Sequence, residues 1–233
     1  VAVAGSFRRC RETVGDIDIL VAAGAESPVM DRFADFEDAR QVLARGETNS
    51  SLLLRSGLQV DLRRVAPESF GAALQYFTGS QAHNIAVRGL GRQRGLKINE
   101  YGVFDGEKKI AGDTEESVYR ALGLAWIPPE LREDRGEIEA AREGRLPALV
   151  EAADIQGELH SHTTATDGRN SLEEMALGAK RRGLKYLAVT DHSQYLKMVG
   201  GLDVRRLQAQ IEEIDRRNAK LKGIRLLKGI EVE

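Results

Sequence analysis

The sequence predicts an α/β protein in two parts, and three observations carry this prediction. The first 65 residues hold apolar runs in which charged residues take alternate positions, the pattern of strands with one solvated face. Pro128 and Pro129 then interrupt regular structure near the middle of the chain. Beyond Ile155, short apolar runs alternate with amphipathic segments of helical period, which indicates a parallel sheet with crossover helices.

The bulk composition is that of a globular protein in water, with 42% apolar and 30% charged residues. No run approaches the ~20 apolar residues of a membrane span, and no signal-peptide pattern is present. The single cysteine, Cys10, cannot form an internal disulfide, which fits a reducing cytoplasm. With a net charge of −2, any contact with nucleic acid must use a local basic patch. Because the chain runs from Val1 to Glu233 without natural-looking ends, we expect a fragment of a longer protein.

The run GSFRRCRETVGDIDIL, residues 5–20, suggests metal and phosphate chemistry. Asp16 and Asp18 are two apart on a predicted strand, so both carboxylates point to one face. A second predicted strand over 58–65 adds Asp61, and pairing beside the first would bring three carboxylates together. Crowded carboxylates repel one another unless a divalent metal lies between them, and the Gly-Ser turn and arginines suit phosphate. The alternative is a solvated strand face with polar residues directed outward.

The middle of the chain predicts a mixed segment over 66–125. Helices are expected from Pro67 to Gly79 and over 81–90. A hairpin turns at Asp105-Gly106. A short helix is expected over 114–122, with an incomplete capping box at its start. Residues 126–155 are predicted to be a linker whose charged run, EDRGEIEAAREGR, is a solvated face.

A second chemical cluster lies in the last part of the chain. Strands are predicted over 158–162, 185–190 and 224–230, with helices from Ser171 and Asp203 between them. Candidate ligands follow these strands at or near their carboxyl ends: His160, His162, Asp167, His192 and Glu231. Imidazole with carboxylate suits Zn²⁺, Mn²⁺ or Fe, and bound metal would make hydroxide for phosphoester hydrolysis. The alternative, satisfied surface or core histidines, explains the full set poorly; His83 has no such partners, and we assign it no metal role.

These motifs together resemble two known families. GSFRR…GDIDIL, VDLR, YFTGSQAHNIAVR and INEYG resemble the X-family DNA polymerases of the polymerase β type. GELHSHTTATDGRNSLEEM, LAVTDHS and GIEVE resemble the PHP (polymerase and histidinol phosphatase) domain. The order of the two resembles the bacterial X-family polymerase. The resemblance implies an α+β nucleotidyltransferase palm over 1–69, a nucleotide-selecting thumb-like subdomain over 70–125 and the start of a β/α PHP barrel over 156–233.

The resemblance also implies roles for individual residues. The three aspartates would hold two Mg²⁺ ions, one activating the primer 3′-OH and one holding the dNTP. Matches to nucleotide-binding positions are Ser6, Arg9, Gly15, Tyr76, Phe77, Gly79 and Asn84. Arg88 matches a position on the template DNA, and Asn84 and Arg88 share a helical face. The PHP ligands would hold Mn²⁺ or Zn²⁺. The implied partners are gapped or nicked DNA and dNTPs, with no membrane. The resemblance implies a monomeric repair polymerase that also has 3′–5′ exonuclease or 3′-end processing activity. It implies a location in the bacterial cytoplasm, at the nucleoid.

Several features depart from the family. Gln59 stands where the animal enzymes carry an arginine that steadies the third aspartate, and Val14 where they have a serine on the triphosphate. Neither the N-terminal helical region nor helix-hairpin-helix elements have a counterpart. The PHP part covers three strands of a seven-stranded barrel, so we expect it not to assemble the complete metal cluster.

Two other functions remain open at the level of sequence. A non-templated nucleotidyltransferase joined to a PHP phosphatase would need no base-pair-inspecting segment such as YFTGS…N…R. A DNA-end-binding scaffold with degenerate sites would not need an intact carboxylate triad and histidine set.

Overall fold

A computed structural model describes residues 1–232 of the chain, which divide into two compact units. The first unit covers Val1–Pro147 and the second begins at Ala148. Each unit is described by itself. No helix within residues 1–232 is long and apolar enough to cross a membrane.

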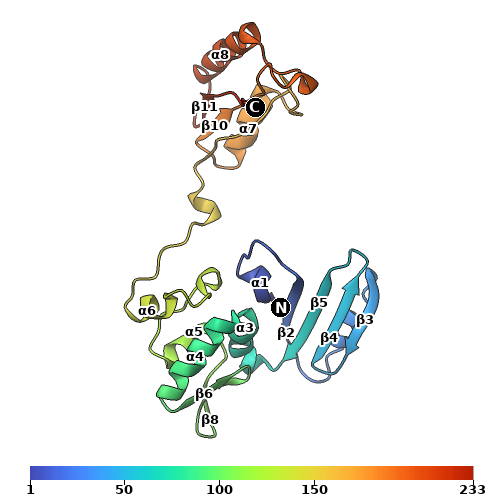
Figure 1. The fold of residues 1–233 in the computed structure, drawn as a ribbon, viewed down its shortest axis with the longest axis vertical. Helices are drawn as coiled ribbons and strands as arrows, with labels where there is room; N and C mark the ends of the chain where they lie inside the picture. The colour runs from blue at the N-terminus through green and yellow to red at the C-terminus, as the bar shows by residue number, and fades with distance from the viewer. Residues whose placement is uncertain (233) are drawn as a thin grey trace. The chain divides into compact units, whose positions relative to one another are not determined.

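A five-stranded mixed sheet forms one lobe of the first unit (Figure 1). The order across the sheet is β1-β2-β5-β4-β3. Its strands are β1 (Ala2–Val3), β2 (Asp16–Ala22), β3 (Ala39–Arg45), β4 (Asn49–Leu54) and β5 (Gln59–Val65). Only β2 and β5 run parallel, and their register places Asp18 opposite Asp61. The predicted pairing of the two aspartate-bearing strands is therefore present, flanked by antiparallel strands.

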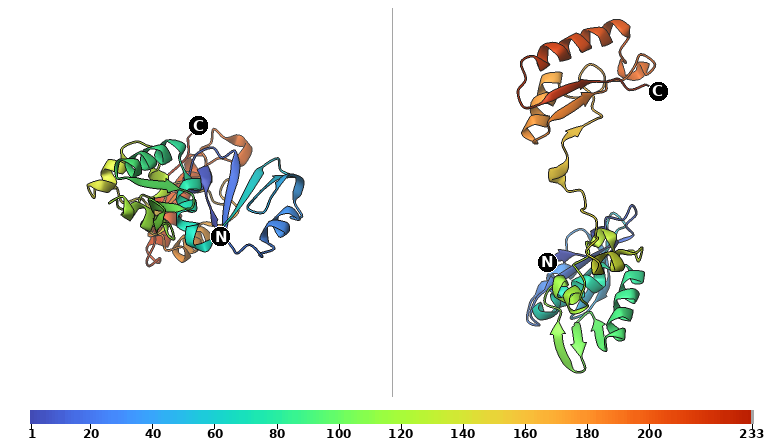
Figure 2. Two further views of the ribbon diagram at one scale, coloured as in Figure 1. Left: turned by 90° about the horizontal axis from the view of Figure 1, so that it is seen from below. Right: turned by 90° about the vertical axis from the view of Figure 1, so that its left-hand side faces the viewer.

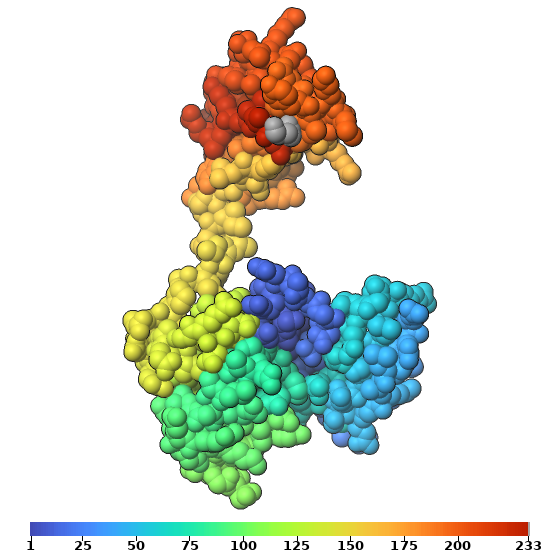
Figure 3. Space-filling model, viewed as in Figure 1, coloured from blue at the N-terminus to red at the C-terminus, as the bar shows by residue number. Residues whose placement is uncertain are grey.

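Helices and a three-stranded sheet form the other lobe of this unit. The space-filling view shows the two lobes, with the N-terminal residues in dark blue between them (Figure 3). Its helices are α3 (Phe70–Thr78), α4 (Gln81–Gln93), α5 (Glu115–Ala121) and α6 (Glu137–Arg142), and its strands are β6 (Leu96–Asn99), β7 (Gly102–Asp105) and β8 (Lys108–Ala111). The short helices α1 (Gly5–Arg8) and α2 (Val29–Ala34) complete the unit.

Residues 126–147 pack into this lobe, so the predicted linker over 126–155 is wrong for most of its length. Ile127 is fully buried, and Ile138 and Ala141 of α6 join the same core. Arg132, in the predicted linker just before the charged run, is fully buried, and Glu137 within that run is buried as well. The prolines interrupt helix and strand as predicted, but the segment continues as two short helical turns whose apolar residues close the core. Only the residues from Ala148 onward leave the first unit.

Two helix starts show how local sequence sets these elements. Ser80 caps α4 by accepting a hydrogen bond from His83 N at 3.2 Å. Thr114 caps α5, and here the capping box is complete, because the Ser117 hydroxyl replaces the usual Glu or Gln. The expectation of an incomplete box is thus wrong.

The second unit is a parallel sheet with one helix after each of its first two strands. The order is β11-β10-β9, with α8 lying along the sheet (Figure 2, right). The elements are β9 (Gly157–Glu158), α7 (Leu172–Arg181), β10 (Tyr186–Val189), α8 (Val204–Asn218) and β11 (Arg225–Lys228). Ala176, Leu187, Ile214 and Leu226 form its core. β9 ends at Glu158, so His160 and His162 lie in the segment after the strand and not on it as predicted.

Candidate nucleotide pocket and candidate metal centre

The first predicted cluster is built where α1 meets β2. Gly5 begins α1 with a φ of +64°, and a Cβ at this position would overlap Oδ2 of Asp18. The backbone N–H of Ala4 donates to the carbonyl oxygen of Asp18 at 2.8 Å. Glycine is required here for two reasons, the left-handed backbone and the close approach of a carboxylate. The turn therefore places backbone N–H groups and the Ser6 hydroxyl beside Asp18.

A cavity of about 390 Å³ brings most of the predicted nucleotide-site residues together. From the turn and β2 come Ser6, Arg9, Asp16 and Asp18; from α3, α4 and the turn between them come Tyr76, Phe77, Gly79, Asn84 and Arg88. Gly15 precedes β2 without lining the cavity, and a Cβ there would meet nothing within 4 Å. The structure thus joins residues that lie up to about eighty positions apart in the chain.

The three aspartates repel one another across this cluster. Burial raises the pKa of Asp18 first, and the charges of Asp16 and Asp61 raise it further, against the opposing effect of Arg63 and Arg9. Carboxylate oxygens are the donors that Mg²⁺ prefers, and a bound divalent cation would offset the repulsion among the three aspartates on these paired strands. The residues present therefore fit Mg²⁺.

The Asp61 carboxylate is held by two neutral donors. Gln59 Nε2 donates to Oδ2 at 2.9 Å, and the Ser51 hydroxyl of β4 makes a short hydrogen bond to Oδ1. Gln59, a position at which the sequence departs from the family that it resembles, therefore steadies the third aspartate. Ser51 has the same role from the neighbouring strand, and sequence reasoning missed it because register decides the contact.

Arg9 is positioned by the helical lobe. Its Nη1 donates to the carbonyl oxygen of Thr78 at 2.5 Å, and its Nε donates to Glu133 at 2.8 Å. Arg11 lies 3.6 Å from the same glutamate. A guanidinium paired with a single flanking carboxylate can exchange that partner for phosphate, which it binds in the same geometry.

Asn84 supports the backbone at the end of α3. Its Nδ2 donates to the carbonyl oxygen of Tyr76 at 2.6 Å, and its Oδ1 accepts from Gln75 at 2.9 Å. The Arg88 guanidinium lies 5.9 Å from the centre of the Tyr76 ring, and the Arg63 guanidinium lies 4.4 Å from that of Phe77. The nitrogen and the oxygen of the Asn84 side-chain amide are thus both hydrogen-bonded within the protein. Tyr76, Phe77 and Arg88 form the wall of the cavity.

A buried carboxylate that the sequence did not indicate joins the two lobes. Arg8 donates to Glu115 through two parallel N–H groups at 2.7 Å each, and Arg132 donates to it at 2.6 Å. Trp126 donates from its ring N–H at 3.2 Å. Although burial opposes ionisation, these donors lower the pKa of Glu115 to about 2. The network fixes α1, and with it the Gly5–Ser6 turn, against α5.

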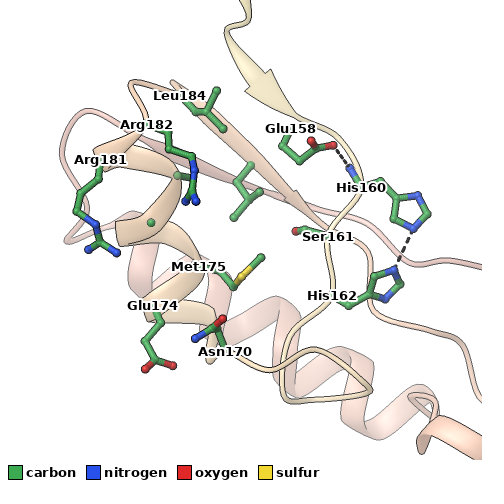
Figure 4. Close-up of a pocket in the computed structure, with 13 residues that line it drawn as sticks. Glu158, His160, Ser161, His162, Asn170, Glu174, Met175, Arg181, Arg182 and Leu184 are labelled. Carbon is green, nitrogen blue, oxygen red and sulfur yellow. Dashed lines mark hydrogen bonds between the residues drawn. The ribbon is translucent and has the colours of Figure 1, made fainter. Parts of the chain in front are cut away.

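The second predicted cluster forms at the carboxyl end of the second unit's sheet, and Figure 4 shows two of its members, His160 and His162, with their rings directed toward each other. Nε2 of His160 and Nε2 of His162 lie 3.0 Å apart, and each is 3.4 Å from Oε2 of Glu231. Nδ1 of His192 is 3.1 Å from the same oxygen. Asp167 lies 3.5 Å from both His162 and His192. All five predicted ligands are therefore together.

These residues fit metal ions better than a structural role. They form two groups of three whose ligand atoms lie within 4.8 Å of one another: His160, His162 and Glu231, and His162, Asp167 and His192. Nδ1 of His162 and Oε2 of Glu231 are buried without a hydrogen-bond partner within the part of the chain that the structure describes. Buried polar atoms are normally satisfied, so the mixed imidazole and carboxylate set fits divalent metal ions.

His83, which was given no metal role, is a core residue. It is fully buried on α4, with Nδ1 2.6 Å from Glu137 and Nε2 2.9 Å from the Tyr119 hydroxyl. The Glu137 carboxylate also accepts from the backbone N–H groups of Asp134 and Arg135. This cluster anchors residues 133–137 to the helical lobe.

Comparisons with known proteins match both units. A family model described as DNA polymerase beta thumb matches residues 73–133, and one described as PHP domain matches residues 158–233. The chain is 41% identical to "DNA polymerase/3'-5' exonuclease PolX" of Bacillus subtilis (strain 168), over 99% of this chain and 41% of that protein. It is 28% identical to DNA polymerase lambda of Rattus norvegicus over 55% of this chain and 28% of the relative. The chain thus spans less than half the length of these two relatives.

A solved structure agrees on the fold. Leishmania infantum polymerase beta, described as a ternary P/T complex, has a TM-score of 0.50 at 22% identity and covers 57% of this chain and 66% of its own. This likeness shows an α+β nucleotidyltransferase fold for the corresponding part. The chain therefore combines a match to the polymerase beta thumb with a match to the PHP domain, and over nearly its whole length it is similar to a bacterial protein whose name joins a DNA polymerase with a 3′–5′ exonuclease.

Proposed function

We propose that the chain carries the nucleotidyl-transfer core of a template-directed, gap-filling DNA polymerase, joined to a PHP phosphoesterase that processes 3′ ends. One observation carries the polymerase part: a single cavity is lined by the Gly5–Ser6 turn, Asp16, Asp18, Tyr76 and Arg88. These residues offer a phosphate site, a metal site and a wall for a base pair in one place. The names of the Bacillus and rat relatives agree with this proposal.

Asp16 and Asp18, which line this cavity, would hold Mg²⁺ together with Asp61, which lies opposite Asp18 on the neighbouring strand. When bound, Mg²⁺ neutralises phosphate charge and lowers the pKa of an attacking hydroxyl. Gln59 and Ser51 keep the Asp61 carboxylate directed along its strand, so its orientation does not depend on the ion.

The remaining residues bind and orient the nucleotide. The Gly5–Ser6 turn offers N–H groups and a hydroxyl to the triphosphate, and Arg9 adds a charge when phosphate replaces Glu133 as its partner. Tyr76, Phe77 and Gly79 pack against the sugar and leave no room for a ribose 2′-OH. Asn84 keeps the backbone of this wall in place, and Arg88 reaches the template side.

The second unit would hold Mn²⁺ or Zn²⁺ through His160, His162, Asp167, His192 and Glu231. Metal at this position supplies hydroxide for hydrolysis of a phosphodiester bond. We assign to it 3′–5′ exonuclease or 3′-end processing.

The wider setting follows from these assignments. We propose a palm over residues 1–69 and a thumb-like subdomain that begins at residue 70 and continues to Pro147. Gapped or nicked DNA and dNTPs are the partners, and a monomer in the bacterial cytoplasm acts on nucleoid DNA. The names of the Bacillus and rat relatives support the DNA part of this proposal.

Primer extension on a one-nucleotide gap tests the polymerase assignment. Asp16→Asn should abolish nucleotide addition and leave 3′-end hydrolysis intact, because the two metal sites lie in different units. Asp35→Asn, which removes an exposed carboxylate of the same unit, is the matched control. His160→Ala should have the reverse effect and remove only hydrolysis. Retained polymerisation by Asp16→Asn would refute the assignment, and equal addition to gapped and single-stranded DNA would favour a non-templated transferase.

A further inference from the structure

A strongly basic segment lies beside the candidate nucleotide pocket. Residues 81–99 contain no aspartate or glutamate, yet they carry four cations, although the chain as a whole has 36 acidic and 34 basic residues. Three of the four, Arg88, Arg92 and Lys97, line one cavity of about 520 Å³. The cavity is lined by residues of α4, of β6 and of the turn at Gly106. Its lining contains no carboxylate, and Leu96 and Ile98 give it an apolar floor.

The cations of this cavity have almost no partners in the protein. Arg88 donates from Nε to the Asn84 carbonyl oxygen at 3.2 Å. Arg92 and Lys97 are exposed and make no hydrogen bond or ion pair within residues 1–232. Arg88 and Arg92 are four residues apart on one helix, a spacing at which like charges repel by about 0.2–0.5 kcal/mol. Asp105 and Glu107 flank Gly106 in the chain but do not line the cavity, and a cavity lined by like charges with no carboxylate suits an anionic ligand.

Arg88 connects this cavity to the candidate nucleotide pocket. It lines both cavities, so the basic surface continues from the Asp16–Asp18 cluster along α4. Arg88 and Arg92 are separated by about 6 Å along the helix axis, and Lys97 follows on the adjoining strand. A linear polyanion that leaves the pocket at Arg88 would meet the next two cations in turn.

We propose that Arg92 and Lys97, with Arg88, form a phosphate track that binds the sugar–phosphate backbone of the DNA strand passing over Arg88. The proposal rests on the proposed polymerase function and adds two residues to its DNA-binding surface. Phosphate contacts of this kind position the duplex and carry no base preference. The track therefore affects DNA affinity for every sequence alike and leaves binding of the dNTP unchanged.

The salt dependence of DNA binding tests the track. The slope of log K against log salt concentration is negative, and each lost phosphate contact makes it less steep by about 1. Arg92→Gln with Lys97→Gln should therefore reduce its magnitude by about 2 and weaken binding to gapped DNA about tenfold. The KM for dNTP should not change. The matched control, Arg120→Gln with Arg135→Gln, removes two exposed arginines of the same unit that line neither cavity, and it should keep the parental slope.

A charge-preserving variant and neutral phosphate analogues complete the test. Arg92→Lys with Lys97→Arg preserves both charges and should retain the parental slope, which separates charge from folding. Methylphosphonate placed singly along the template or the primer strand should weaken binding by the parent on one strand only, and so identify that strand. Equal slopes for the track variant and its control, or no effect of methylphosphonate on either strand, would overturn the proposal. If the parent extends gapped DNA in the same assays, such a result refutes the track alone and leaves the polymerase function standing.

Discussion

Replacing Glu115 by glutamine should destabilise the first unit by about 3 kcal/mol. The carboxylate is buried with Arg132, whose side chain has no exposed surface, and with Arg8. Its pKa falls from 4.5 to about 2, which corresponds to about 3 kcal/mol in favour of the folded state above pH 4.5. Removing one partner of a buried ion pair costs about 3–5 kcal/mol, which agrees with this figure.

Urea unfolding followed by tryptophan fluorescence measures this loss. Trp126 is the single tryptophan of the chain and donates to Glu115, so its emission reports the first unit alone. With an m-value of about 2 kcal/mol/M, Glu115→Gln should lower the urea midpoint by about 1.5 M at pH 7. Glu116→Gln, the exposed neighbour on the same helix, is the control and should change the midpoint by less than about 0.3 M.

The pH dependence gives the prediction its second arm. A carboxyl group with a lowered pKa stabilises the folded state above its unfolded pKa and loses this effect as the pH falls toward its folded pKa. The gap between the parent and Glu115→Gln should therefore be constant above about pH 5.5 and shrink between pH 4.5 and 2. A gap no larger than that of Glu116→Gln at pH 7, or one that persists undiminished at pH 2, would refute the reasoning.

Three other substitutions have definite expected outcomes. Gly5→Ala should lower the free energy of unfolding by about 1–3 kcal/mol, measured by urea unfolding, because the added Cβ displaces the Asp18 carboxylate. The same displacement should reduce nucleotide addition in primer extension, and a normal kcat in this variant would contradict the close approach of Asp18 to Gly5. Gln59→Leu should raise the Mg²⁺ concentration for half-maximal extension several-fold, because the Asp61 carboxylate loses a donor; Gln59→Asn is the partial control. Glu137→Gln should lower stability by about 2 kcal/mol above pH 4.5 and converge with the parent toward pH 2, since its pKa is also about 2; a constant difference across that range would count against it.

The elements that carry the chemistry could be predicted because their signals are local. The alternation around Asp16 and Asp18 identifies a strand and its polar face, and the parallel register of β2 and β5 then brings Asp61 opposite Asp18. The capping box of Ser171 and Glu174 likewise starts α7 where the sequence indicates. Period and caps are properties of a few neighbouring residues, so a single sequence reveals them.

Contacts between distant segments could not be predicted in the same way. The prolines and charges of residues 126–147 are typical of a linker when each is considered alone. Arg132 is nevertheless buried, because it forms an ion pair with Glu115, seventeen residues earlier in the chain. The Arg8–Glu115 pair spans 107 positions. The spacing of His160 and His162 predicts that both lie on a strand, but β9 pairs with β10 only through Gly157 and Glu158.

The loop that carries two of the candidate metal ligands is ordered by the protein itself. Asp191 is fully buried and accepts hydrogen bonds from Thr163 N at 2.8 Å, from the hydroxyls of Thr163 and Thr166 at 2.7 and 2.6 Å, and from Gln210 of α8 at 2.6 Å. These bonds fix the backbone between His162 and Asp167. Ordering a residue costs about 1–2 kcal/mol in conformational entropy. Because this loop is already ordered before an ion binds, the free energy of metal binding is not used to fold the loop. The second unit should therefore exchange its metal without unfolding around it.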